Sequence, residues 1–178
     1  MRIMPNKMQV TFVRHGETES SKEGRKLSEA GKVSMFALAE AYIPSRPLLL
    51  VSSALMRAEQ SAAILAQIYQ VEARTDVRLN EPESSVVGIP PRLEPQTWRR
   101  YVAGLRQLLI ETLALPIAEV MIVGHSGTVD AMFDHLGMNG ALEVAIDHAA
   151  ITEFEYRHGD PEGEWLLSKH NWHPEMTT

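Results

Sequence analysis

The sequence predicts an α/β fold, a three-layer sandwich in which a mainly parallel central sheet carries helices on both faces. Short apolar runs typical of buried strands alternate with longer amphipathic segments along the chain. Two of these runs end in polar, glycine-containing loops, as strands do at the sheet edge where ligands bind. The 178 residues are 44% hydrophobic and 22% charged, an ordinary globular composition with enough length for one sizeable core. We therefore expect a single domain over residues 1–178.

The first half of the chain is expected to supply two strands and two helices. Residues 8–13 (MQVTFV) are apolar and β-branched and stop at a polar cluster, which predicts a buried strand. Ser28 precedes a segment with apolar residues at helical spacing, and Pro44 ends it. Residues 48–51 (LLLV) predict a second strand, and the alanine-rich residues 54–69 predict a second amphipathic helix.

The second half begins with an irregular connection. Residues 80–95 contain four prolines and favour a long loop. The other expected elements are a helix over 97–115, a buried strand at 120–123 (VMIV), a helix over 128–136 and a terminal hairpin formed by 151–156 and 164–168.

Charge and residue content exclude several classes of function. Seventeen Lys and Arg against twenty-three Asp and Glu give a formal net charge of -6 at pH 7 without a local basic patch, so we expect no nucleic-acid partner. The chain has no Cys, hence no disulfide, thiolate zinc site or cysteine nucleophile. Polar residues near the start do not resemble a signal peptide, and no stretch approaches the roughly 20 apolar residues of a membrane span. A cytoplasmic protein without membrane contact is expected.

Two histidines follow two of the predicted strands. His15 comes directly after the first strand and His125 after the strand at 120–123, each beside a glycine that lets the backbone approach a ligand closely. The carboxyl ends of parallel strands share one edge, so we expect both imidazoles there. Arg14, and Arg57 near the expected start of a helix, add guanidinium groups suited to phosphate oxygens. The pattern predicts a phosphate-binding pocket.

Four segments carry recognisable motifs in a consistent order. They are RHGET at residues 14–18, LSEAG at 27–31, SSALMRAEQ at 52–60 and VGHSGT at 123–128. These segments resemble, in turn, the signature, the L(S/T)xxG segment, the SSxLxRAxQ segment and the second-histidine motif of the histidine phosphatase superfamily, also called the phosphoglycerate mutase-like family. The resemblance runs from about Val10 to Leu136, and the first and third motifs together are highly specific.

The resemblance implies a phosphoryl transfer in which His15 attacks phosphorus and becomes a phosphohistidine. The phosphate-binding groups it implies are Arg14, Thr18, Arg57, His125 and the backbone near Gly127. A ring of fixed donors can neutralise the transferred group without a metal, so no metal or cofactor is expected. A nucleophilic His15 must be neutral, whereas a cationic His125 would best stabilise the phosphate oxygens, so we expect opposite protonation states.

The acid that protonates the leaving oxygen has two candidates. Glu81, in LNE at residues 79–81, resembles the family's LxE position, and its carboxyl is suited to donate a proton. Glu83 competes for this role, because the glycine usual after this position is displaced to Gly88. The alternative is that both are solvated loop carboxylates.

The resemblance favours the compact phosphatases over the mutases. Residues 22–26 (KEGRK) leave a much shorter loop than mutases have, and Ser21 and Ser126 replace residues common in the family. We expect a phosphatase acting on a small phosphorylated substrate or on a phosphoprotein, including phosphohistidine in proteins, with specificity residing in residues 80–95. A mutase-type phosphotransferase and an inactive phosphate-binding protein are the alternatives. The other histidines, His148 among them, lack metal-ligand spacing and are expected to be structural or surface residues.

Overall fold

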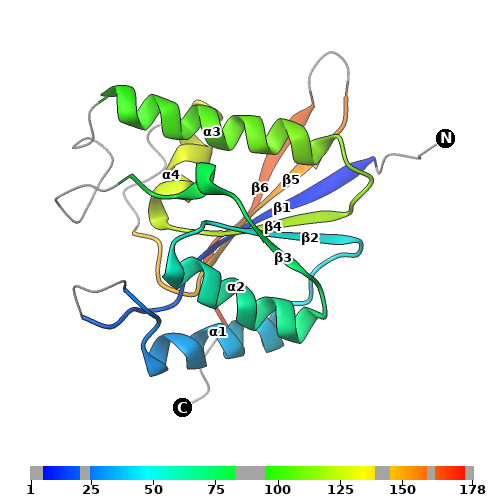
Figure 1. Cartoon of the computed structure of the whole chain (residues 1–178). Helices are drawn as coiled ribbons and strands as arrows, with labels where there is room; N and C mark the ends of the chain where they lie inside the picture. Colours follow the sequence, from blue (N-terminus) through cyan, green and yellow to red (C-terminus); the bar gives the residue numbers. More distant parts are fainter. Residues whose placement is uncertain (1–5, 21–24, 83–94, 139–144, 160–162, 175–178) are drawn as a thin grey trace.

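The computed structural model describes residues 6–20, 25–82, 95–138, 145–159 and 163–174. Within these residues, six strands form one sheet in the order β3-β2-β4-β1-β5-β6 (Figure 1). The strands are β1 (Lys7–Arg14), β2 (Leu48–Ser52), β3 (Ala73–Thr75), β4 (Glu119–Gly124), β5 (Ile151–Arg157) and β6 (Glu164–Trp172). The neighbours among β1 to β4 pair in parallel, while β5 runs antiparallel to both β1 and β6. The mainly parallel sheet predicted from the sequence is confirmed.

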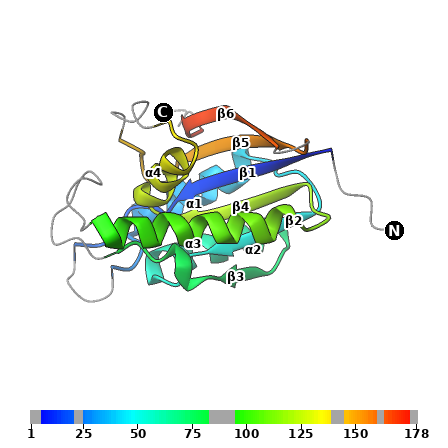
Figure 2. The ribbon, with the colours of Figure 1, turned by 90° about the horizontal axis from the view of Figure 1, so that it is seen from above.

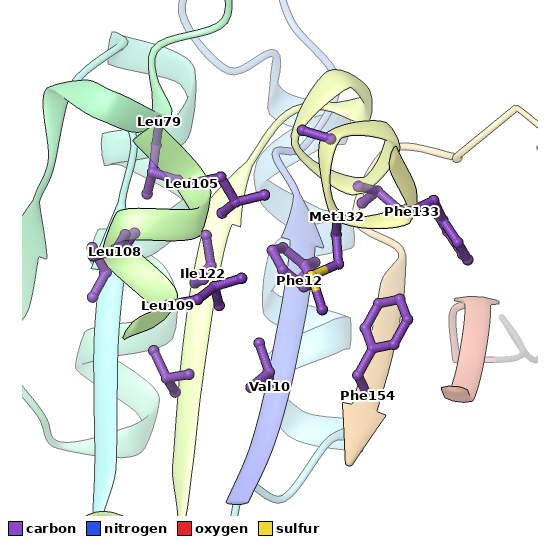
Figure 3. Close-up of a cluster of buried hydrophobic side chains, with 14 of the residues drawn as sticks. Val10, Phe12, Leu79, Leu105, Leu108, Leu109, Ile122, Met132, Phe133 and Phe154 are labelled. Carbon is purple, nitrogen blue, oxygen red and sulfur yellow. The ribbon is translucent and has the colours of Figure 1, made fainter. Parts of the chain in front are cut away.

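Helices cover both faces of this sheet (Figure 2). They are α1 (Glu29–Ala41), α2 (Met56–Tyr69), α3 (Pro95–Leu113) and α4 (Ser126–His135), and a short 3-10 helix, η1, spans Val77–Leu79. The central strand β4 is buried on both faces, so its side chains point alternately into two cores. Met121 packs with α1 and α2 in one core, and Ile122 packs with α3 and α4 in the other. Figure 3 shows the second core, where Leu105 and Met132 lie over the sheet residue Phe12.

The predicted helices form with small shifts of their ends. Ser28 caps α1, since its Oγ accepts a hydrogen bond from the N–H of Gly31 at 3.0 Å. The other three helices begin at Met56, Pro95 and Ser126, each within two residues of the start expected from the sequence. The terminal hairpin is also confirmed, with β5 and β6 longer than expected.

The strand β3 and the helix η1 were not predicted. Arg74 and Thr75 are exposed at the edge of the sheet, so this three-residue strand contains no apolar run that would indicate it. The helix η1 directly precedes the connection that was expected to be irregular, and only Leu79 within it is buried. Residues 83–94 of the expected connection, Glu83 included, lie outside the described residues.

A buried acidic cluster lies near the amino end of β4, away from the strand ends that carry the histidines. Glu119 and Glu153 are almost completely buried, and the single hydroxyl of Tyr42 lies 2.9 Å from one carboxylate and 2.7 Å from the other. That hydroxyl has one proton, so it cannot donate to both carboxylates at once. Burial raises the pKa of Glu119, which favours its protonated form and lets the cluster share hydrogen bonds without two adjacent charges.

This cluster predicts a pH-dependent contribution to stability. The pKa of Glu119 is higher in the folded than in the unfolded chain, so its contribution is complete below the unfolded value and is lost as the pH rises through the folded one. The Glu119→Gln variant keeps the shape and the hydrogen-bonding capacity without a titratable proton. Its free energy of unfolding relative to the wild type, measured by urea denaturation, should increase from pH 5 to pH 8. An unchanged difference across that range would show that Glu119 is ionised in both states.

Candidate active site

The two histidines lie together at the carboxyl edge of the parallel strands. His15 directly follows β1 and His125 directly follows β4, and these neighbouring strands pair with Arg14 opposite Gly124. The backbone N–H of His15 donates to the carbonyl of Gly124 at 3.0 Å. The two imidazole rings are 5.2 Å apart between centroids and are only 6% and 1% exposed. The parallel sheet thus brings together the two motifs that the sequence placed at separate strand ends.

Close backbone packing holds the loop that carries His15. A Cβ on Gly31 would lie 2.1 Å from the carbonyl oxygen of Glu17, and one on Gly16 would lie 2.6 Å from the carbonyl oxygen of Gly31. Only glycine allows this contact between the first turn of α1 and the loop. The N–H of Gly16 also donates to Ser61 Oγ at 3.1 Å, which ties the loop to α2.

His125 is held at the start of α4. Its backbone N–H donates to Thr128 Oγ1 at 3.0 Å, and the hydroxyl of Tyr101 on α3 lies 2.8 Å from the same oxygen. A Cβ on Gly124 would come within 2.4 Å of Thr128 Oγ1, so the glycine before His125 leaves room for this hydroxyl. The second-histidine motif is therefore anchored to two helices.

The Nε2 atom of His15 is unprotonated and carries a lone pair. Its Nδ1 lies 2.7 Å from the carbonyl oxygen of Gly16, and because a carbonyl only accepts, Nδ1 carries the proton. Nε2 then accepts a hydrogen bond from Arg57 Nε at 3.1 Å. Burial and the guanidinium groups of Arg57 and Arg14 lower the pKa of His15 to about 3. At neutral pH the imidazole is uncharged, the state that nucleophilic attack requires.

The expectation of a cationic His125 is wrong for the free protein. Burial, followed by the charge of Arg57, lowers the pKa of His125 to about 2, so both imidazoles are neutral. The carboxylate beside it, Glu81, places Oε2 3.8 Å from Nδ1, beyond hydrogen-bonding distance. The cost of burying a charge therefore outweighs the attraction of the nearby carboxylate.

Glu81 lies among the groups expected to bind phosphate. Its Oε2 is 3.6 Å from Arg57 Nη2, and its Oε1 accepts a hydrogen bond from the backbone N–H of Gly127 at 3.2 Å. Together with the 3.8 Å approach to His125 Nδ1, these contacts place a carboxyl between Arg57, His125 and the first turn of α4. Of the two carboxyl groups considered from the sequence, Glu81 is thus positioned beside the histidines, while Glu83 falls outside the described residues.

Arg14 is fixed by contacts that the sequence did not indicate. Its Nη1 donates to the carbonyl of Ile146, and its Nη2 donates to His148 Nε2 at 3.0 Å. The His148 ring lies 5.3 Å from that of His15. His148 is exposed, as expected for a surface residue, but it borders the pocket. It lies three residues before β5, which is antiparallel to β1, so the start of β5 lies at the same edge as the end of β1.

Asp130 is a second carboxyl near the pocket that was not predicted. It lies on α4 three residues after Gly127, hence on the same side of that helix. Burial and the charge of Glu81 raise its pKa to about 6. Thr18, in contrast, forms an antiparallel bridge with Leu27, and no hydrogen bond joins it to the histidines or arginines in the described part of the chain.

A family model described as histidine phosphatase superfamily (branch 1) matches residues 10–87. The match contains RHGET, the SSALMRAEQ segment and Glu81, which are the residues that the fold gathers at one edge. Residues 10–87, a little under half of the chain, are thus similar to the histidine phosphatase superfamily. No curated protein sequence matches it significantly.

Solved structures similar to this protein include both phosphatases and a mutase. The native mycobacterial glucosyl-3-phosphoglycerate phosphatase is 23% identical, covers 94% of this chain and 100% of its own, and superposes with a TM-score of 0.75. Phosphoglycerate mutase from Bacillus anthracis is 13% identical, covers 93% of this chain and 93% of its own, and superposes with a TM-score of 0.71. A putative alpha-ribazole-5'-P phosphatase from Escherichia coli is 15% identical, covers 92% of this chain and 97% of its own, and superposes with a TM-score of 0.66. These similarities show a shared fold.

Neither a group of metal-binding side chains nor a membrane-spanning helix is found in the described part of the chain. Among the described residues, no group of three or more His, Asp or Glu side chains is arranged to hold a metal ion. None of the helices in the described part of the chain is long and apolar enough to cross a membrane.

Proposed function

We propose that the protein is a phosphatase that hydrolyses a phosphomonoester, or phosphohistidine in a protein, through a phosphohistidine on His15. The observation that carries this proposal is a neutral, buried imidazole whose Nε2 lone pair lies within 3.1 Å of a guanidinium group, in a pocket bordered by a second guanidinium. Two buried nitrogens of this pocket, Arg14 Nε and His125 Nδ1, have no hydrogen-bond partner among the described residues. A bound phosphoryl group would supply hydrogen-bond partners for both nitrogens.

In the first step, His15 Nε2 forms a bond to phosphorus while the bond from phosphorus to the leaving oxygen breaks. Glu81 transfers its proton to that oxygen, which departs as an alcohol. Arg57 donates to the Nε2 lone pair in the free protein, so its guanidinium must turn toward the phosphate oxygens for attack to occur. Binding of the phosphoryl group therefore exposes the nucleophile and provides charge neutralisation at the same time.

In the second step, a water molecule attacks the phosphohistidine. The water gives a proton to the Glu81 carboxylate, the bond between phosphorus and Nε2 breaks, and inorganic phosphate leaves with His15 restored. Arg14 and Arg57 keep the transferred group in line with both the attacking and the leaving atoms. These steps assign catalytic roles to His15 and Glu81 and phosphate-binding roles to the two arginines and His125.

The short connection between the first motif and α1 favours hydrolysis over transfer to a second substrate. Thr18 and Leu27 pair directly, so a segment of few residues separates them. A long insertion able to cover a second substrate site is absent from the sequence at this position. We therefore propose water as the acceptor of the phosphoryl group.

A substrate panel tests this proposal. The panel includes phosphoglycerates, glucosyl-3-phosphoglycerate, alpha-ribazole 5'-phosphate, sugar phosphates and one phosphohistidine protein. Release of inorganic phosphate that is lost in the His15→Ala variant supports the phosphatase. Movement of the phosphoryl group to a second hydroxyl supports a mutase instead, and phosphate binding without turnover of any substrate supports an inactive phosphate-binding protein.

Replacing Arg57 by alanine is expected to reduce kcat/KM on the order of a hundredfold or more, because it removes the guanidinium nearest to the nucleophile. Arg46→Ala is a suitable control, since Arg46 donates to the carbonyl of Tyr69 at the other end of α2. Equal losses in the two variants would argue against a specific role for Arg57.

Removal of divalent metal ions should leave activity unchanged, because Arg14 and Arg57 are proposed to supply the positive charge near phosphorus. The measurement is the rate of phosphate release before and after treatment with a chelator. Loss of activity that a divalent ion restores would contradict this account.

A further inference from the structure

His125 is connected to a series of two hydrogen-bonded polar side chains that the mechanism above does not use. Its Nε2 lies 3.0 Å from Ser53 Oγ, at the end of β2, and Ser53 Oγ lies 3.0 Å from Asn80 Oδ1, just after η1. Ser53 is fully buried. Asn80 and Ser53 both lie within motif segments of the sequence, yet neither touches His15 or the arginines through the hydrogen bonds found among the described residues.

The Asn80 side chain, at the far end of this series of hydrogen bonds, determines the direction of each of them. The backbone N–H of Ala54 donates to Asn80 Oδ1 at 2.8 Å, so this side-chain atom is the carbonyl oxygen and not the amide nitrogen. A carbonyl oxygen has no proton to give, so the Ser53 hydroxyl must donate to it. Having used its only proton, Ser53 Oγ can act toward His125 only as an acceptor.

The proton of the neutral His125 ring therefore lies on Nε2, and Nδ1 carries the lone pair. Nδ1 is buried without a hydrogen-bond partner and lies 3.8 Å from Glu81 Oε2. His15 has the opposite tautomer, with its proton on Nδ1. In the free protein the two imidazoles thus differ in tautomer, whereas burial keeps both uncharged.

We propose that Asn80 and Ser53 are positioning residues that fix the tautomer of His125, so that its Nδ1 meets the phosphoryl group as an unprotonated base and takes up one proton when that group binds. The inference rests on the proposed function in that the ligand is a phosphoryl group. The proton comes from the P–OH of a phosphomonoester monoanion or from solvent, and it leaves a dianion hydrogen-bonded to an imidazolium. Charge on His125 then appears only when a counter-charge is present, which avoids a buried unpaired cation.

The other nitrogen-bearing groups around His125 do not supply this proton acceptor. Its charged and titratable neighbours are Arg57 on α2, Arg14 and His15 at the end of β1, and Glu81 after η1. The two arginines remain charged, and the Nε2 of His15 is proposed to bond to phosphorus. His125 Nδ1 is therefore the buried nitrogen that can change its protonation state when an anion enters.

The test records proton–nitrogen correlation spectra of the histidine rings in the whole protein, free and saturated with inorganic phosphate, with His125 assigned from the His125→Gln spectrum. We expect the Nε2–H tautomer in the free protein and protons on both nitrogens with phosphate bound. Between pH 7.5 and 8.5 the affinity for phosphate should fall about tenfold per pH unit, as uptake of one proton requires.

Variants of Asn80 separate positioning from general structural support. In Asn80→Ala the Ser53 hydroxyl is free to donate to Nε2, so part of the His125 population should shift its proton to Nδ1 and the pH dependence of phosphate affinity should flatten. Asn80→Asp keeps an acceptor oxygen and should retain the wild-type tautomer. Thr112→Val removes another buried hydroxyl, near the end of α3, and should change only stability.

Three results would overturn the inference: a proton on Nδ1 of free His125, an unprotonated Nδ1 with phosphate bound, or an Asn80→Ala variant whose tautomer and pH dependence equal those of the wild type. No response of any ring to phosphate would overturn it as well. Failure of the proposed function is distinguishable, because it would leave the expected tautomer and proton uptake in place while no phosphomonoester is hydrolysed.

Discussion

Replacing His15 by alanine should abolish turnover, with a loss of at least about ten-thousandfold, while the fold remains intact. The lone pair on Nε2 is the proposed nucleophile, and the chain has no cysteine to take its place. The ring contacts the protein through hydrogen bonds to Gly16 and Arg57, so its removal leaves the two apolar cores unchanged. Circular dichroism and thermal unfolding measure the fold, and rapid quenching with a labelled phosphodonor measures the phosphoenzyme.

The label on the wild-type protein should be stable in alkali and labile in acid, and should disappear in His15→Ala. His135→Ala is a matched control, because His135 lies at the far end of α4 from His125 and should retain the full label. Label trapped on His125 in place of His15 would refute the assignment of the nucleophile.

Replacing Glu81 by glutamine should slow phosphoenzyme formation from alkyl phosphates by roughly a hundred- to ten-thousandfold and from nitrophenyl phosphate only slightly. An alkoxide is a strongly basic leaving group that needs a proton, whereas a nitrophenolate is stable without one. Glutamine keeps the size of the side chain and its ability to accept from the N–H of Gly127, so the difference isolates the acidic proton. The measurement is the rate of the first step for both substrates.

Two other carboxyl groups provide controls for this experiment. Asp130→Asn tests the buried carboxyl on α4 whose pKa is raised to about 6, and Glu83→Gln tests the alternative from the sequence. Equal slowing of both substrates in Glu81→Gln would make Glu81 a binding residue only. A defect selective for alkyl phosphates in Asp130→Asn or Glu83→Gln would move the proton donor to that position.

The local sequence was sufficient to predict the elements with a strong apolar pattern and the two strand ends that carry the histidines. A parallel strand buried on both faces, such as β4, must be apolar throughout, and this run is visible without any tertiary information. The exposed edge strand β3 is not visible in this way, since Arg74 and Thr75 carry no such signal. The motifs also placed Arg57 in the first turn of α2, where its guanidinium reaches His15.

The protonation of the site was decided only by the tertiary structure. Whether His125 is charged depends on how much water the surrounding elements exclude, a property that no single segment of sequence contains. Its tautomer depends on a chain of hydrogen bonds through Ser53 to Asn80, residues that β2 and η1 bring together across the sequence. His148 reaches the pocket because β5 runs antiparallel to β1, which puts its first residues at the edge where β1 ends. The sequence by itself determined which chemical groups the site contains, whereas packing determined their charge, tautomer and neighbours, because burial and hydrogen-bond direction arise only between elements distant in the chain.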